Sequence, residues 1–302
     1  MARSGPKAGS GPTLASSGHM ANSGPTTSSG VMAHFHEIPL VLFSALATAG
    51  GGVGAAHMVA GFLGGSWALS DARALLLSGL LLLAAVLSLG HLGRPGRGPL
   101  ALLGLGRSPL SNEIGALGLA LALGASSLVL PWGPWTPVIG FLASLASAFF
   151  LLTLGWVYVL PGQVAWGRLG AASPLVLGFT WGLLLDAGLP GGIPASTWPL
   201  TFWPALLLDG VLTGVRWLSL ERAAPGADIA HPRIFPRRRI LLGSRLALTT
   251  LAAPAALLAG AWPLGVLFFA GALLLDRLGF YALALRRTTE SEVRRVESLL
   301  RP

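Results

Sequence analysis

The chain has 302 residues, of which 53% are hydrophobic and 10% are charged. Soluble domains carry about 25% charged residues, so this composition excludes an ordinary water-soluble fold. The sequence contains no Cys, which excludes disulfides, c-type haem and thiolate-ligated iron–sulfur clusters within this chain. We assign the net charge of +9 to membrane topology rather than to nucleic-acid binding, because most basic residues lie between the apolar stretches.

The first segment, residues 1–33, is rich in Ser, Gly, Pro and Thr. It has no apolar periodicity and cannot bury enough apolar surface to fold, so we expect a disordered tail. The apolar region of a secretory signal peptide is missing from it. Residues 34–287 are predicted to form the membrane domain, and residues 288–302 a charged C-terminal tail.

Eight apolar stretches follow in the predicted membrane domain. Each is long enough for a helix that crosses a hydrocarbon layer of about 30 Å. Alternating segments of a transmembrane barrel are absent. The sequence therefore predicts an all-α integral membrane protein, a bundle of about eight transmembrane helices. The predicted spans are residues 38–64, 74–91, 114–131, 136–160, 172–189, 198–219, 241–260 and 262–285.

The connections between these spans differ sharply in basic residues. With eight spans, 16 Arg and Lys residues fall on the side of the N-terminus and one, Arg73, on the opposite side. By the positive-inside rule both termini are predicted to be cytoplasmic. The arginines could also serve only to set topology and to bind anionic lipid.

A histidine and a carboxylate flank the second connection. His91 closes the second predicted span and Glu113 opens the third. Because neighbouring antiparallel helices place both at one membrane level, the two residues could share a pocket. An imidazole can hydrogen-bond a quinone oxygen, and a partly desolvated carboxylate can pass protons to water. This pair is therefore the candidate catalytic site for proton-coupled quinone chemistry.

The polar residues beside this pair have two interpretations. Ser111 and Asn112 could shape the pocket, or one of them could cap the third predicted helix, with Glu113 favoured in its first turn by the helix dipole. Three nearby arginines could line the pocket or hold an acidic partner. They are Arg94, Arg97 and Arg107.

Other polar residues in the apolar domain are weaker candidates. His36 and Glu37 open the first predicted span on the same side as His91 and could line the same pocket. In the last predicted span, Asp276 and Arg277 suggest a buried ion pair, with Tyr281 as a pocket wall. Asp209 and Arg216 share one face of the sixth predicted span and could pair with each other or with other helices, whereas Asp186 is expected to face water.

The remaining motifs limit the choice of function. No metal motif, phosphate-binding loop or nucleophile elbow is present, and four histidines at two matched depths, which a di-haem cytochrome needs, are absent. We therefore predict no haem and no metal in this chain. Two alternatives remain, a secondary transporter that would depend on Asp209 and Asp276, and a purely structural membrane anchor.

Three segments carry a resemblance to a known family. These are His36-Glu37-Ile38-Pro39-Leu40, His91-Leu92-Gly93-Arg94-Pro95, and Ser108-Pro109-Leu110-Ser111-Asn112-Glu113-Ile114, in this order. Residues 34–285 resemble the membrane anchor subunit of the dimethyl sulfoxide reductase family. Leu278-Gly279-Phe280-Tyr281 is similar to that family's last span, with less specificity.

The resemblance implies a membrane anchor that exchanges electrons between menaquinone or ubiquinone and a ferredoxin-like partner subunit with four [4Fe–4S] clusters. That partner would serve a molybdopterin catalytic subunit, in a bacterial or archaeal cytoplasmic membrane. The residues matching His91 and Glu113 are the ones that such anchors use for quinol binding and oxidation. The charge distribution favours a cytoplasm-facing complex, as in related anchors of sulfite dehydrogenases.

Overall fold

The computed structural model describes residues 38–91, 95–157, 159, 168–189, 193, 195–223, 228–229, 235–283 and 285–286. The predicted tails at 1–33 and 288–302 lie outside these residues. The helices are α2 (Ile38–Phe62), α3 (Asp71–His91), α4 (Pro109–Val129), α5 (Thr136–Trp156), α6 (Arg168–Ala187), α7 (Phe202–Ala223), α8 (Arg238–Ala247), α9 (Ala253–Leu258) and α10 (Trp262–Ala282). Shorter elements are the 3-10 helices η1 (Pro95–Gly104), η2 (Ala195–Leu200) and η4 (Phe235–Arg237), the π-helical turn η5 (Leu248–Ala252), and strands β1 (Asp228–Ile229) and β2 (Leu285–Arg286).

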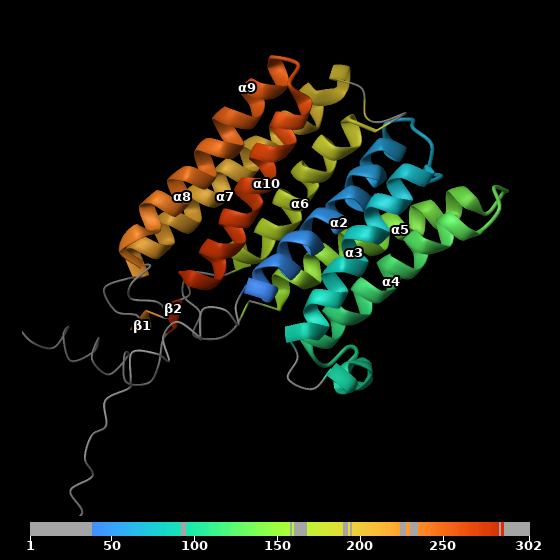
Figure 1. The fold of residues 1–302 in the computed structure, drawn as a ribbon, viewed down its shortest axis with the longest axis horizontal. Helices are drawn as coiled ribbons and strands as arrows, with labels where there is room; N and C mark the ends of the chain where they lie inside the picture. Colours follow the sequence, from blue (N-terminus) through green and yellow to red (C-terminus); the bar gives the residue numbers. More distant parts are fainter. Residues whose placement is uncertain are drawn as a thin grey trace, which may run out of the picture.

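The long helices lie side by side as a bundle (Figure 1). Within the described residues, six are long and apolar enough to cross a membrane: α2, α3, α4, α5, the continuous rod from α8 to α9, and α10. Helix α6 contributes a shorter apolar stretch, Ala172–Ala187, and α7 carries Asp209, Arg216, Glu221 and Arg222. The all-helical fold is thus confirmed, while the count of eight spans stays a prediction for α6 and α7.

Helix α2 occupies the centre of the bundle, with α3, α4 and α5 on one flank and α7 to α10 on the other (Figure 1). It contacts α3, α5, α6 and α10, and most of its residues are buried. Its start and the end of α10 lie at the same end of the bundle (Figure 1). The side of the membrane that this end faces stays a prediction.

Small residues let α2 and α6 approach closely. A methyl group added at Gly52 would lie 1.9 Å from the carbonyl oxygen of Gly178, and one added at Gly182 would lie 1.9 Å from the carbonyl oxygen of Gly52. Only glycine fits at such a crossing, which is the way membrane helices gain close backbone packing. We call Gly52, Gly178 and Gly182 the glycine seam.

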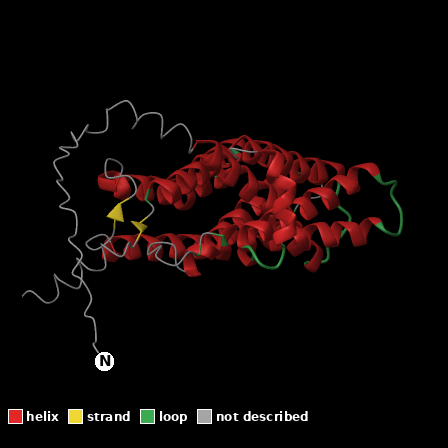
Figure 2. Ribbon diagram, turned by 90° about the horizontal axis from the view of Figure 1, so that it is seen from below, coloured by secondary structure: helices red, strands yellow, loops and turns green. Residues whose placement is uncertain are grey.

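Two irregular elements occur outside the long helices, one between α8 and α9 and one at the end of the bundle. The π-helical turn η5 joins α8 to α9 two residues before Pro254. Because proline lacks an N–H and crowds the preceding turn, a local change of helical pitch accommodates it. Beyond the helices, β1 pairs antiparallel with β2, with Asp228 opposite Arg286. This pair lies at one end of the helical body (Figure 2).

Candidate functional site

The start of α4 differs from the sequence expectation. The helix begins at Pro109, and Ser108 is its N-cap, with extended backbone angles and a side-chain oxygen 3.5 Å from the Ser111 N–H. Proline suits the first helical position because its missing N–H has no partner there anyway. The alternative that Ser111 or Asn112 caps this helix is therefore wrong. Glu113 lies beyond the first turn, so capping does not explain it.

Glu113 is buried at the end of the bundle where α4 begins. The residue is 3% exposed, and its Oε1 atom has no hydrogen-bond partner in the described part of the structure. A charged carboxylate in such a place would be costly unless paired. A carboxyl group at this depth is suited to take up and release a proton.

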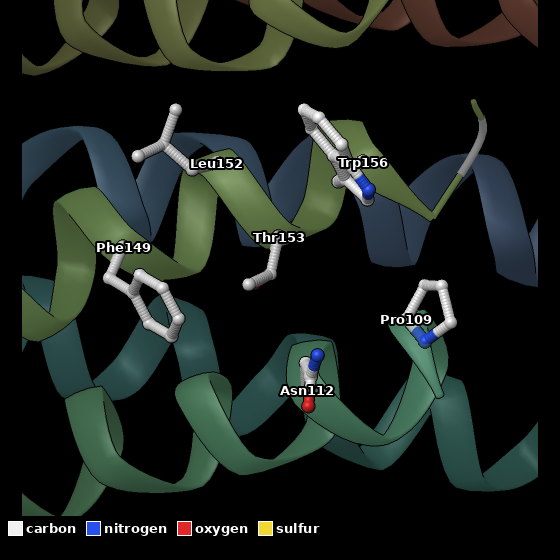
Figure 3. A pocket seen from close by; sticks show the side chains of 6 residues that line it. All are labelled: Pro109, Asn112, Phe149, Leu152, Thr153 and Trp156. Carbon is white, nitrogen blue, oxygen red and sulfur yellow. The ribbon is translucent and has the colours of Figure 1, made fainter. Parts of the chain in front are cut away.

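A pocket of about 210 Å³ lies between α4 and α5, and it is lined by Asn112, the residue that precedes Glu113 in the sequence. Figure 3 shows the side chains that line it, with Phe149 and Thr153 of α5 pointing toward α4. They are Pro109, Asn112, Phe149, Leu152, Thr153 and Trp156. The lining is mainly apolar, with the Asn112 amide and the Thr153 hydroxyl as polar groups, the pattern that small-molecule sites prefer.

The two polar groups are held by local hydrogen bonds. The Asn112 Oδ1 atom accepts a hydrogen bond of 2.7 Å from the Gly106 N–H, which places the amide nitrogen on the side facing α5 (Figure 3). The Thr153 hydroxyl donates to the Phe150 carbonyl at 2.9 Å and retains lone pairs that can accept. The pocket therefore offers at least one side-chain donor and one acceptor.

The rim of the pocket belongs to the outer surface of the bundle. Phe149 is 52% exposed and Trp156 is 60% exposed. Both are on α5, and α4 and α5 are both candidate spans, so in a membrane this rim would face lipid. A lipid-soluble molecule could reach the pocket without passing through water.

Sequence reasoning missed the α5 side of this pocket. Phe149, Thr153 and Trp156 are spaced at i, i+4 and i+7, which puts them on one helix face. That spacing was the available signal, but in an apolar helix it is equally typical of simple packing.

The structure describes only part of the predicted site. His91 is the last residue of α3 and Arg97 belongs to η1, but their side chains are outside the described residues, as are His36, Glu37 and Arg94. Arg107 is exposed in the turn that precedes α4. Tyr281 is in α10, on the other flank of α2 from α4 (Figure 1), and does not line the pocket.

The expected buried ion pairs are present, with partners that the sequence did not specify. Asp276 pairs with Arg277 at 3.1 Å and with Arg216 at 2.7 Å. Asp209 does not pair with Arg216 on its own helix but with Arg245 of α8, at 2.5 Å. Pairing with other helices is the alternative that holds.

Asp186 corrects an expectation. It was expected to face water, but it is 0% exposed and pairs with Arg73 of α3 at 2.5 Å. Its second oxygen accepts a hydrogen bond of 2.8 Å from the Ile193 N–H. Arg73 thus neutralises a buried carboxylate.

Fold and composition together define the class, a helical protein whose described residues include six helices long and apolar enough to span a membrane. Among the described residues, no group of three or more His, Cys, Asp or Glu side chains could hold a metal ion. Comparison of the sequence with protein-family models gives no match, and comparison with curated proteins gives none either.

Proposed function

We propose that this chain is the quinone-reactive membrane anchor of a molybdopterin oxidoreductase complex. The observation that carries the proposal is Glu113, a buried carboxyl group whose Oε1 atom has no hydrogen-bond partner among the described residues, next in sequence to Asn112, which lines the pocket between α4 and α5. Quinone chemistry moves electrons together with protons, so it needs an apolar pocket for the ring and a proton-exchanging group nearby.

Each described residue has a role in this proposal. The Asn112 amide and the Thr153 hydroxyl would hydrogen-bond the oxygens of the quinone headgroup, with Trp156 and Phe149 packing against its apolar parts. Glu113 would exchange the proton, and His91 at the end of α3 would bind the headgroup. The quinone, menaquinone or ubiquinone, would be an exchangeable substrate drawn from the membrane.

The electrons would be exchanged with partner subunits. Because the chain has no Cys, thiolate-ligated iron–sulfur clusters must belong to another chain. The resemblance supports a ferredoxin-like subunit with [4Fe–4S] clusters, which in turn serves a molybdopterin subunit. That partner would dock near η1 and the exposed Arg107, at the end of the bundle where α4 begins. The complex would lie in a bacterial or archaeal cytoplasmic membrane with both termini cytoplasmic.

The transporter alternative depended on Asp209 and Asp276. Both are 1% exposed and both are paired with arginines, so neither offers a free carboxylate to a transported cation. A purely structural anchor would leave the Glu113 carboxyl group without a role.

The decisive experiment compares two carboxyl groups. We expect Glu113→Gln to lower the rate of quinol oxidation by the purified complex, with an artificial electron acceptor, by about a hundredfold or more, the usual contribution of a proton-transferring group. Glu221→Gln, the same chemical change at the end of α7, is the matched control and should retain the wild-type rate.

Binding and assembly are measured on the same variants. The complex should co-purify with molybdenum or tungsten and iron in wild type and Glu113→Gln alike. Thr153→Val should weaken the binding of a short-chain quinone. This binding is measured in nanodiscs by the quenching of tryptophan fluorescence. Unchanged quinol oxidation in Glu113→Gln, or a chain that purifies without any metal-carrying partner, would overturn the proposal.

A further inference from the structure

Five charged side chains meet inside the flank formed by α7, α8 and α10. They are Asp209, Arg216, Arg245, Asp276 and Arg277, and each is between 0% and 3% exposed. We call these five residues the arginine cluster. It lies on the opposite flank of α2 from the pocket between α4 and α5 (Figure 1), so its role is independent of the proposed quinone chemistry.

Direct contacts tie the cluster together across helices. Asp276 is the common partner, 2.7 Å from Arg216 Nη1, 3.1 Å from Arg277 Nη2 and 3.5 Å from Arg245 Nε. Arg245 also pairs with Asp209 and donates to the Thr213 hydroxyl. These distances place all five charges in one electrostatic unit.

The charges in the cluster do not balance. Three arginines face two aspartates, which leaves one positive charge in excess among the described residues. Arginine cannot shed its proton in a protein, so the excess cannot be removed by titration of the guanidinium groups. Uncompensated charge in an apolar interior is strongly unfavourable. A bound counter-charge is the physical remedy.

Arg277 shows where the counter-charge belongs. It is 1% exposed, and its Nε, Nη1 and Nη2 atoms make no hydrogen bond to any described residue. Its described contacts are the ion pair with Asp276 and the ring of Phe280, whose centroid is 5.8 Å from Cζ. A guanidinium group with unused N–H groups on a rigid fork can donate two parallel hydrogen bonds to an anion with two oxygens.

The surroundings favour entry of an anion. Arg238 begins α8 seven residues before Arg245, about 10 Å away along the helix axis. The arginines at this end of α7 and α8 include Arg222, Arg237 and Arg239, all exposed. A surface rich in one sign of charge raises the local concentration of ions of the opposite sign.

We propose that the arginine cluster binds one small monovalent anion, of carboxylate or nitrate size, on the guanidinium group of Arg277. The anion neutralises the excess charge and accepts hydrogen bonds from the Arg277 donors that the described residues leave unused. Nothing in this proposal requires a partner subunit. The chain is therefore expected to bind such an anion by itself, and to depend on it for part of its stability.

The test uses the full chain in nanodiscs, with thermal unfolding followed at fixed ionic strength. Formate, nitrate or chloride replaces gluconate stepwise. We expect a saturable rise of Tm by about 4 °C or more with at least one of these ions, as for any ligand that binds only the folded state. A wild-type Tm that does not respond, or that rises without saturating, overturns the proposal.

Two variants make the assignment specific. Arg277→Gln removes the excess charge, so its Tm in gluconate should equal or exceed that of the wild type and should not respond to the anions. Arg107→Gln makes the same change at an exposed position before α4, away from the arginine cluster, and should respond as the wild type does. If Arg277→Gln does not fold, Arg277→Lys, which keeps the charge but loses the planar fork, should bind the anion about tenfold more weakly. An anion response of wild-type size in Arg277→Gln, or of wild-type affinity in Arg277→Lys, contradicts the site.

Discussion

The substitution Gly182→Ala should push helices α2 and α6 apart at the centre of the bundle. The added methyl group would lie 1.9 Å from the Gly52 carbonyl oxygen, whereas ordinary contact begins at 3.4 Å. The backbones must therefore move apart by about 1.5 Å, because neither contacting group belongs to a flexible side chain. Overpacking of this kind costs about 1–3 kcal/mol. The upper part of that range applies here, since the move also loosens the contacts that α2 makes with α6.

The matched control is Gly79→Ala in α3, where an added methyl group meets nothing within 4 Å. Alanine favours helix more than glycine does, so this variant should be unchanged or slightly more stable. Reversible unfolding in mixed detergent micelles, titrated with a denaturing detergent, measures both free energies of unfolding. If the two variants differ by less than about 0.5 kcal/mol, the close approach at the glycine seam does not carry the stability that we assign to it.

Two further predictions concern ion pairs. Asp186→Asn removes the negative charge that faces the buried Arg73 guanidinium and should cost about 3 kcal/mol in the free energy of unfolding. Replacing both residues together by apolar ones should recover most of that loss, and an equal loss in both variants would contradict this reasoning. The hydrogen bonds from Arg238 and Arg239 lower the pKa of Glu221 from 4.5 to about 2. Because the pKa of Glu221 is lower in the folded state than in the unfolded state, its ionisation stabilises the folded state at pH values above about 4.5. That contribution is lost as the pH falls from about 4.5 towards 2. The Tm difference between wild type and Glu221→Gln should therefore shrink over this pH interval, and a difference that stays constant would refute the assignment.

The helical fold was predictable because long apolar runs can be recognised as membrane-spanning helices from their composition alone. The expected start of the third span, residue 114, was late, because Ser111, Asn112 and Glu113 look like a loop by hydropathy. The local capping chemistry of Ser108 and Pro109 sets the true start. Where the first turn of a helix is polar, hydropathy places the start of the helix later in the sequence than the hydrogen bonds do.

The partners of the buried charges were not predictable. Sequence spacing put Asp209 and Arg216 on one helix face, but which helix packs against that face depends on the whole bundle. Arg245 lies at the polar end of an apolar stretch and gave no sign of its role. The pocket between α4 and α5 was half predictable, since Asn112 came from a motif whereas Thr153 came only from the packing of two helices.

The arginine cluster has a consequence for how the chain is made. Arg216 and Arg245 leave the ribosome before Asp276, their shared partner, which is 31 residues beyond Arg245 in the chain. At the usual rate of synthesis, about 5–20 residues per second, Arg245 waits roughly 2–6 s for that carboxylate, and Arg216, which is 60 residues before Asp276, waits roughly 3–12 s. During this time Arg245 has Asp209 but lacks its second carboxylate, and Arg216 lacks its ion pair with Asp276, so these cations resist entry into lipid. Integration of α7 and α8 is therefore expected to be completed only when the last helix arrives, so that truncation before α10 would leave two earlier helices poorly inserted.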